Sequence, residues 1–265
     1  MTDRLEGKYA IVTGGGRGIG RAIALAFADQ GAHVAVLGRT RVDLDATVSL
    51  AEGRIGSVTP HVCDIRDEAQ IASATAELAA RWGRIDILVN NAGIDDDTPF
   101  LEIDRDRWRD ILDTNLTAVF VFSQEVARVM RDNGGGVILH TASIDGSGGD
   151  GPYAAYNSSK AALLGLNRTM ALELAKYGIR SNCVSPGVTA TDMTVTSAGP
   201  AMMDYLENSF DRVPMRRLVR TEEVAAAFVF LASSEASAIT GIDLTVDAGL
   251  TSNWYILETL PDKPG

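Results

Sequence analysis

Short runs rich in β-branched residues alternate with longer segments of helical periodicity along most of this chain. The expected strands are 9–13, 33–37, 57–62, 85–90, 136–141, 179–185 and 242–246. The expected helices are 18–30, 41–52, 67–82, 104–131, 154–176 and 221–233. Several of the strands are apolar without alternation, which is typical of strands that helices cover on both faces. This order predicts an α/β fold, with one doubly wound, seven-stranded parallel sheet and helices on both of its faces.

Composition limits the classes of partner. The 265 residues carry 24 Lys+Arg and 35 Asp+Glu, a net charge of −11, and 46% of them are hydrophobic. Such a chain can bury a full core, and its length fits a single domain over residues 1–265. A surface rich in carboxylates repels phosphate backbones and anionic lipids, so we expect no nucleic-acid partner and no membrane partner. Any anionic ligand must then be bound by a local positive site.

The cysteines and the longest apolar run indicate the cellular compartment. Cys63 and Cys183 lie far apart in apolar stretches, which is typical of buried, reduced thiols. The longest apolar run, 224–232, is too short to cross a bilayer, and charges stand where a secretory signal needs an apolar core. We therefore expect a cytoplasmic protein. The histidines share no metal-like spacing and the acidic run 95–97 fits a solvated loop, so we expect no metal.

A glycine-rich turn joins the first expected strand to the first expected helix. Residues 13–20 read TGGGRGIG, a TGxxxGxG spacing that differs from the common GxGxxG fingerprint. Glycines there let the backbone approach a pyrophosphate, and the free N–H groups at the helix N-terminus attract its charge. Glycine also simply makes turns, so it is the position between a strand and a helix that favours a nucleotide.

The end of the second expected strand bears on which nucleotide binds. An acid there accepts hydrogen bonds from the ribose of NAD, whereas an arginine can hold the 2′-phosphate of NADP. This strand ends in Gly38-Arg39, with no acid. Arg17 and Arg39 could together bind a phosphate, although both could instead be ordinary surface arginines. The pattern favours NADP(H), with NAD(H) as the alternative.

A tyrosine, a lysine and a serine have the spacing that proton transfer needs. Tyr156 and Lys160 are four residues apart in an expected helix, so their side chains share one face. A nearby ammonium favours the phenolate, and we expect it to lower the pKa of the tyrosine. Ser143 follows an expected strand, at the sheet edge where it could hydrogen-bond a substrate oxygen. Without further motifs, an exposed tyrosine–lysine pair is the simpler interpretation.

These motifs occur in one order with several others. The glycine turn is followed by CDI at 63–65, NNAG at 90–93, Asn115, Ser143, YxxxK at 156–160 and PGVTAT at 186–191. From residue 6 to about residue 250, the chain resembles the short-chain dehydrogenase/reductase family in its standard short form. The resemblance implies a Rossmann-like fold and hydride transfer between a nicotinamide cofactor and a substrate.

The resemblance also implies roles for the matching residues. The implied catalytic residues are Asn115, Ser143, Tyr156 and Lys160. Asp64 would bond the adenine amino group, or it merely caps the following helix. With Arg39 added, the expected cofactor contacts are Gly14, Arg17, Gly18, Ile19, Gly20, Arg39, Asp64, Ile65, Asn91, Ala92, Gly93, Tyr156, Lys160, Pro186, Gly187, Val188 and Thr191.

In the implied mechanism, Ser143 and Tyr156 hold the substrate oxygen, and Tyr156 gives a proton to a carbonyl or takes one from an alcohol. Lys160 bonds the nicotinamide ribose and lowers the tyrosine pKa. Asn115 holds a water in a relay to Lys160, unless its amide is simply satisfied by the backbone. We therefore expect an NADP(H)-dependent oxidoreductase of a ketone or secondary alcohol. The alternatives are a 3-oxoacyl-[acyl-carrier-protein] reductase and a catalytically silent nucleotide-sensing regulator, although the four intact residues argue against the regulator.

Two segments depart from the repeating pattern. Residues 188–216 form a connection long enough to be a substrate lid, unless they are a plain surface insertion. Residues 250–265 form a C-terminal tail that we expect at a subunit interface, because the family implies a homo-oligomer, a tetramer or a dimer, built in part from paired long helices. The terminal motif VDAG at 246–249 has Ala248 where relatives have glycine, a change expected to leave the chemistry intact.

Several side chains are expected to face the substrate, and they mix acids with small and apolar groups. That mixture fits a medium-sized ketone or secondary alcohol, including a polyhydroxylated one. These residues are Ile144, Asp145, Asp150, Val188, Met193, Met202, Met203 and Tyr205.

Overall fold

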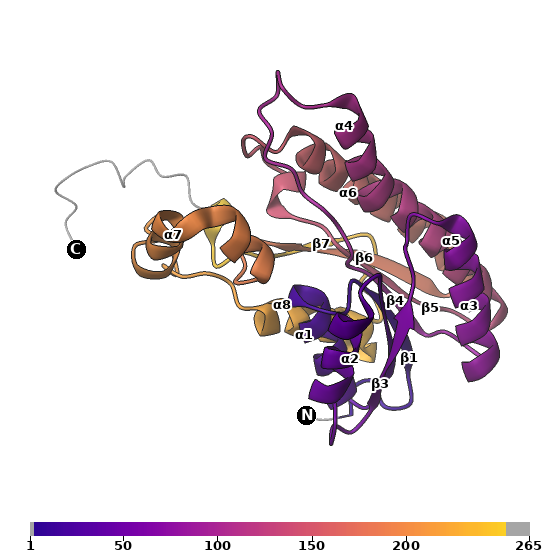
Figure 1. The fold of residues 1–265 in the computed structure, drawn as a ribbon. Coiled ribbons are helices and arrows are strands. Elements are labelled where there is room, and N and C mark those ends of the chain that lie inside the picture. Colours follow the sequence, from indigo (N-terminus) through magenta and orange to yellow (C-terminus); the bar gives the residue numbers. More distant parts are fainter. Residues whose placement is uncertain (1–2, 253–265) are drawn as a thin grey trace.

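Seven parallel strands form one sheet within residues 3–252, the part of the chain that the computed structural model describes (Figure 1). Within that range, the side chains of residues 192–193 and 195–198 are left out of the description. The strand order is β3-β2-β1-β4-β5-β6-β7, and every neighbouring pair is parallel. The predicted doubly wound α/β sheet is thereby confirmed. The strands are β1 (Tyr9–Thr13), β2 (His33–Gly38), β3 (Ser57–Val62), β4 (Ile87–Asn90), β5 (Gly136–Thr141), β6 (Ile179–Pro186) and β7 (Asp243–Val246).

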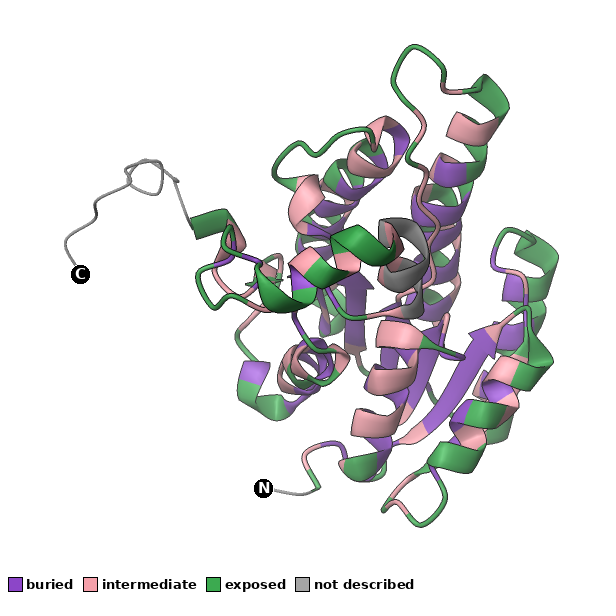
Figure 2. Cartoon of the chain, turned by 60° about the vertical axis from the view of Figure 1, so that its left-hand side comes forward, coloured by how far each residue is buried: buried purple, intermediate pink, exposed green. Residues whose placement is uncertain are grey.

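Helices cover both faces of this sheet. On one face α1 packs against α8, and on the other α3 packs against α5. Figure 2 shows the buried strands as a purple layer between helices whose outer surfaces are exposed. The α-helices are α1 (Gly18–Asp29), α2 (Arg41–Leu50), α3 (Glu68–Trp82), α4 (Arg105–Leu112), α5 (Ala118–Asp132), α6 (Ala154–Leu174), α7 (Asp192–Asn208) and α8 (Thr221–Ala232).

Successive residues of a central strand enter opposite halves of the core. In β1, Ala10 and Val12 pack in the cluster that contains Phe27 of α1 and Phe228 of α8. Ile11 between them packs in the other cluster, with side chains of α3 and α5. Strand side chains alternate between the two faces, and here both faces are apolar. This is why these strands appear in the sequence as unbroken apolar runs.

The predicted helix 104–131 is divided in the structure. A π-helical turn, Asp113–Thr117, separates α4 from α5 and carries Asn115. The Asn115 amide binds the backbone of Ile94, in the loop that follows β4. Single π turns inside α-helices are frequent at functional sites. The interruption therefore places a polar side chain beside the carboxyl ends of the strands.

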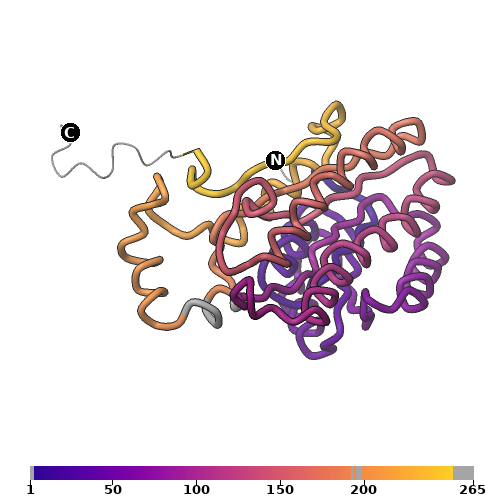
Figure 3. Tube along the Cα trace, turned by 90° about the horizontal axis from the view of Figure 1, so that it is seen from above, coloured from indigo at the N-terminus to yellow at the C-terminus, as the bar shows by residue number. Residues whose placement is uncertain are grey.

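Residues 188–216 contain a helix that the sequence pattern did not predict. The backbone of α7 breaks at Gly199, where φ is +68°, and the next residue is Pro200, which has no N–H to donate. Figures 1 and 3 show α7 to one side of the main body of the molecule. The segment has its own small apolar cluster of Leu206, Phe210 and Val213.

The predicted tail, 250–265, is described only at its start, where Leu250–Ser252 form a short 3₁₀ turn. Residues 253–265 lie outside the described residues, and so does the side chain of Met193. None of the described helices combines the length and the apolar character that a membrane-spanning segment requires.

Candidate active site

The candidate site lies where the carboxyl ends of β1, β4 and β5 meet, and one asparagine ties these ends together. Asn91, just after β4, donates through Nδ2 to the Thr13 carbonyl oxygen at 3.1 Å. The Thr141 hydroxyl donates to Asn91 Oδ1, also at 3.1 Å. The backbone N–H groups of Asn91 and Ala92 both donate to the Thr13 hydroxyl. Thr13 and Thr141 were not among the predicted site residues, and their sequence signal is a hydroxyl on the last residue of a buried strand.

The glycine turn packs so closely on these strand ends that side chains are excluded. A Cβ on Gly20 would lie 2.2 Å from the Gly14 carbonyl oxygen and 2.5 Å from Asn91 Nδ2. Gly14 itself has φ +65°, a conformation that side chains rarely adopt. Arg17 is the N-cap of α1, and its side chain does not cap the helix. The first backbone N–H groups of α1 therefore have no side-chain cap as an acceptor. A close, uncapped helix N-terminus fits the pyrophosphate of a dinucleotide.

The segment after β6 lies against the same turn. Pro186 ends β6, and a Cβ on Gly187 would come within 2.8 Å of Asp247 Cβ. Thr191 caps α7 by accepting a hydrogen bond from the Thr194 N–H at 3.2 Å. A Cβ on Gly18 would be 3.7 Å from Thr191 Cγ2. The structure therefore brings together two predicted cofactor segments that are far apart in the sequence.

Three other predicted cofactor residues lie around the glycine turn and the catalytic candidates. Val188 packs against the apolar cluster of the α7 segment, and Ile19 packs, partly buried, against the core on the α1 side. Gly93 lies beside the catalytic candidates, because its Cβ would be 3.2 Å from Asn115 Oδ1 and 3.8 Å from Lys160 Nζ.

The two arginines predicted to bind a phosphate are both exposed. Within the described part of the chain, neither the Arg17 nor the Arg39 side chain makes a hydrogen bond or an ion pair, whereas Arg41 is paired with Asp45 at 2.8 Å. Hydrogen bonds from Arg66 lower the pKa of Asp64, and the positive charge of Arg39 lowers it further, so Arg39 lies near Asp64. Both guanidinium groups are therefore free to bind an anion.

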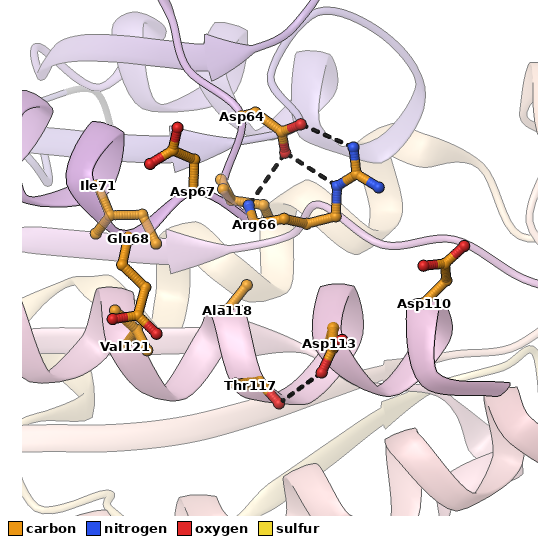
Figure 4. Close-up of a pocket in the computed structure, with 11 residues that line it drawn as sticks. Asp64, Arg66, Asp67, Glu68, Ile71, Asp110, Asp113, Thr117, Ala118 and Val121 are labelled. Carbon is orange, nitrogen blue, oxygen red and sulfur yellow. Dashed lines mark hydrogen bonds and ion pairs between the residues drawn. The ribbon is translucent and has the colours of Figure 1, made fainter. Parts of the chain in front are cut away.

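Asp64 and Ile65 line a pocket of about 480 Å³ between the start of α3 and the α4–α5 region (Figure 4). Arg66 folds back onto the Asp64 carboxylate, with Nη2 to Oδ2 at 2.8 Å. Asp67 rather than Asp64 caps α3, so the helix-cap alternative for Asp64 is wrong. The pocket is strongly acidic, which does not suit a phosphate. Its carboxylates are Asp64, Asp67, Glu68, Asp110 and Asp113.

Lys160 is buried beneath the site, with 5% of its surface exposed. Its Nζ donates to the Thr141 carbonyl oxygen at 2.7 Å and lies over the Tyr156 ring, 5.4 Å from the ring centroid. Burial lowers the pKa of Lys160 to about 8. Thr141 thus links the lysine to Asn91, and through it to the glycine turn.

Tyr156 is one helical turn before Lys160 on α6, beside Ser143, which follows β5. Burial raises the pKa of Tyr156, and a hydrogen bond with Ser143 only partly opposes this effect. The prediction that Lys160 lowers this pKa is therefore wrong for the arrangement seen here. The ammonium contacts the ring face and the Thr141 carbonyl rather than the phenol oxygen. Tyr156 is consequently protonated at neutral pH.

Asn115 is buried and its amide is satisfied by protein groups. Oδ1 accepts from the Ile94 N–H at 2.9 Å, while Nδ2 donates to the Ile94 carbonyl at 2.8 Å and to the Ser159 hydroxyl at 3.1 Å. This matches the alternative of a backbone-satisfied amide, and the side chain fixes the loop after β4 against the π turn. The water relay to Lys160 stays a prediction.

The described residues contain no group of three or more His, Cys, Asp or Glu side chains placed to hold a metal ion. The site brings the glycine turn together with a serine, a tyrosine and a lysine at one edge of a doubly wound sheet. These features define a dinucleotide-binding α/β protein with groups for proton transfer.

Comparisons with known proteins extend this assignment. A family model described as Enoyl-(Acyl carrier protein) reductase matches residues 14–251. The 3-oxoacyl-[acyl-carrier-protein] reductase FabG of Thermotoga maritima is 38% identical over 247 residues, 93% of this chain and 99% of that protein. The D-threitol dehydrogenase of Mycolicibacterium smegmatis is 36% identical and covers 94% of each chain.

A crystal structure of a short-chain type dehydrogenase/reductase from Mycobacterium marinum superposes with a TM-score of 0.87 and 36% identity, covering 94% of this chain and 97% of that one. The chain therefore belongs to the short-chain dehydrogenase/reductase family of NAD(P)-dependent oxidoreductases.

Proposed function

We propose that this protein is an NADP(H)-dependent carbonyl reductase or alcohol dehydrogenase that acts on a small ketone or secondary alcohol. The observation that carries the proposal is the placement of Ser143, Tyr156 and Lys160 at the sheet edge that the glycine turn adjoins. Family membership supports hydride transfer in general. The names of similar proteins cover both acyl-carrier-protein and polyol substrates, so support for one substrate class has to come from the site rather than from the family.

The residues present fit a nicotinamide dinucleotide. The glycine turn leaves no room for side chains near Gly14 and Gly20, and Thr191 borders the turn from the other side. When bound, the nicotinamide supplies or accepts the hydride. Tyr156, protonated at neutral pH, donates its proton to the carbonyl oxygen during reduction and recovers one from the alcohol during oxidation. Ser143 would hydrogen-bond the same oxygen, and Lys160 would hold the ribose of the cofactor.

The preference for NADP(H) is supported by Arg39, which follows β2 and has no ion-pair partner among the described residues. A charge-assisted hydrogen bond to a phosphate contributes about 1.5–3 kcal/mol, or roughly ten- to hundredfold in affinity. Arg39→Ala is expected to weaken NADPH binding by that factor and to leave NADH binding unchanged. Arg41→Ala is the matched control, because Arg41 is already paired with Asp45. Equal NADPH affinity in the wild type and Arg39→Ala would refute the phosphate-binding role.

The direct test of the activity is a panel of small ketones and secondary alcohols, followed by the absorbance of NADPH. Cofactor-dependent turnover of members of this panel supports the proposal, and it excludes a catalytically silent nucleotide sensor. NADPH binding without turnover of any panel member would instead favour the sensor.

Reduction of a 3-oxoacyl group on a carrier protein is the second candidate, favoured by the similarity to FabG. Its substrate carries a phosphopantetheine arm and an acidic carrier. The carboxylates of Asp145 and Asp150 lie near the catalytic side chains, and like charges disfavour such a substrate. A carrier-bound 3-oxoacyl thioester that is reduced more efficiently than free ketones would favour this candidate over the first.

We also infer a cytoplasmic location. Cys63 and Cys183 are both free and buried, which supports a reducing compartment.

A further inference from the structure

Asp145 competes for the one proton of the catalytic serine candidate. The Ser143 hydroxyl donates to Asp145 Oδ2 at 3.1 Å, and the Asp145 N–H donates back to Ser143 Oγ at 3.2 Å. A serine hydroxyl has a single proton and two acceptor positions. While Asp145 accepts that proton, Ser143 cannot also donate it to a substrate oxygen.

The Asp145 carboxylate is partly buried and can accept a further hydrogen bond. It is only partly exposed, and burial raises its pKa, although the hydrogen bond from Ser143 opposes this effect. Among the described residues, Ser143 provides the one side-chain hydrogen bond that Asp145 accepts. A partly buried carboxylate with so few donors favours binding of a hydroxyl.

The surroundings of Asp145 carry further negative charge. Burial raises the pKa of Tyr153, the N-cap of α6, and the carboxylates of Asp95, Asp97, Asp150 and Asp145 raise it further. The Tyr153 ring lies edge-on to that of Tyr156, with centroids 6.4 Å apart. This side of the catalytic pair therefore disfavours anions and favours neutral molecules that donate hydrogen bonds.

We propose that Asp145 selects substrates with a hydroxyl on the carbon next to the reacting one, that is, α-hydroxyketones and the vicinal diols formed by their reduction. The inference rests on the proposed function. Ser143 contacts the reacting oxygen, and Asp145 is one hydrogen bond beyond Ser143. The two oxygens of an α-hydroxyketone are themselves about one hydrogen-bond length apart, so one substrate can contact both residues at once.

Binding of the second hydroxyl also changes what Ser143 does. When the substrate hydroxyl donates to Asp145, the Ser143 proton is free to turn to the reacting carbonyl oxygen. No proton is transferred to Asp145, which only exchanges one hydrogen-bond donor for another. A ketone without the second hydroxyl leaves the Ser143 proton with Asp145. Asp145 therefore affects turnover as well as binding.

The test compares acetoin with butanone, two ketones on the same carbon skeleton of which acetoin alone has the neighbouring hydroxyl. In NADPH-dependent reduction, the wild type should show kcat/KM for acetoin about ten- to hundredfold above that for butanone, the size expected for a hydrogen bond to a charged group. Asp145→Ala should remove this preference in two ways. It lowers kcat/KM for acetoin, and it raises kcat for butanone because Ser143 is released.

Two further variants separate this role from a structural one. Asp145→Asn keeps an acceptor oxygen, so it should restore part of the acetoin preference that Asp145→Ala loses. Asp97→Asn removes an exposed charge that makes no contact with Ser143, and it should keep the preference. NADPH affinity and thermal unfolding of Asp145→Ala should match the wild type.

Equal kcat/KM for acetoin and butanone in the wild type would overturn the inference, and so would a preference that persists in Asp145→Ala. Both results include NADPH oxidation, so the proposed function would stand. If neither this pair nor hydroxyacetone and acetone is reduced, the inference is also wrong. If no ketone at all supports NADPH oxidation, the proposed function fails with it.

Discussion

At the scale of residues, burial sets the protonation states in and below the candidate site. It raises the pKa of Tyr156 and lowers those of Lys160 and His140, so each shift favours the neutral form. For Tyr156 this means that a proton is available for carbonyl reduction at neutral pH. Oxidation of an alcohol needs the phenolate and is expected to become faster toward alkaline pH.

His140 should make the fold sensitive to acid. It lies fully buried in β5, with Nδ1 3.3 Å from Asn90 Nδ2 and Nε2 3.3 Å from the Ser181 hydroxyl. Burial lowers its pKa from 6.5 to about 3, so the unfolded chain binds the proton more readily. The free energy of unfolding should therefore fall as pH drops below 6.5, by at most about 1.4 kcal/mol per pH unit.

Urea unfolding at a series of pH values measures this effect. The His140→Gln variant, which has no titratable group at this position, should lose less stability on acidification than the wild type. Parallel pH profiles for the two proteins would contradict the assignment.

Ala248 has a backbone conformation that favours glycine. Its φ is +54°, and a left-handed conformation costs an L-residue roughly 1–2 kcal/mol. Glycine loses more entropy on folding, which offsets part of the gain, so Ala248→Gly should raise the free energy of unfolding by about 0.5–1 kcal/mol. Gly249→Ala is the opposite case, because its φ is +89° and its Cβ would lie 3.0 Å from Pro214 Cγ.

Chemical denaturation of both variants, with kcat as a second readout, checks this account. Activity should be unchanged in Ala248→Gly. Equal stability of Ala248→Gly and the wild type would show that the strain is relieved elsewhere.

At the scale of elements, the α7 segment is distinct from the main core. Leu206, Phe210 and Val213 form its own apolar cluster, against which Val188 and Tyr205 pack. The segment begins at Thr191, which lies against Gly18 of the glycine turn. The α7 segment begins beside the site and packs around a cluster of its own, which is the arrangement of a lid, and we propose that role for residues 188–216.

Two phenylalanine variants, one in the main core and one in the α7 cluster, distinguish a lid from a purely structural segment. Phe228→Ala, in the α1–α8 core, should lower the free energy of unfolding by about 3–5 kcal/mol and leave the KM of the folded enzyme close to that of the wild type. Phe210→Ala, in the α7 cluster, should lower stability less but raise KM for substrate. The measurements are urea unfolding and steady-state kinetics. A KM unchanged by Phe210→Ala would argue against a lid.

Local sequence patterns predicted most elements, and long-range contacts explain the exceptions. The strand ends agree to within one or two residues, because apolar runs bounded by turns are local signals. The π turn was not predictable, since it accompanies a contact between Asn115 and Ile94, which are far apart in the sequence. Helix α7 was missed because Gly199 and Pro200 interrupt its periodicity.

In the candidate site too, local spacing was predictive, whereas burial and long-range contacts were not predictable. The spacing of Tyr156 and Lys160 correctly placed both on one helical face, and Ser143 beside them. Spacing says nothing of burial, however, so the direction of the Tyr156 pKa shift was predicted wrongly. The hydrogen bond from Ser143 to Asp145 depends on the turn that follows β5, and no sequence motif predicted it.

At the scale of the whole molecule, we propose that the long helices pair with those of a second subunit, as the family resemblance implies. Phe120 of α5 is 47% exposed and Leu172 of α6 is 82% exposed. In the homo-oligomer that the family resemblance implies, paired long helices would cover these two side chains.

Leu172→Glu should therefore reduce the mass of the assembly, because it buries a charge at the proposed interface. Leu50→Glu on α2 is the control, a substitution of the same kind at a position 53% exposed and away from α5 and α6. Light scattering coupled to size exclusion gives the mass. An unchanged mass for Leu172→Glu would exclude this face as an interface.

The central claim is that Tyr156 transfers the proton in an NADP(H)-dependent reaction, and Tyr156→Phe tests it most directly. Phenylalanine keeps the ring that lies under the Lys160 ammonium and removes only the hydroxyl. NADPH binding, measured by fluorescence, should be retained, while kcat for ketone reduction should fall by about 10²–10⁴-fold, the usual contribution of general acid catalysis. Retained turnover in a variant that binds NADPH normally would contradict the account.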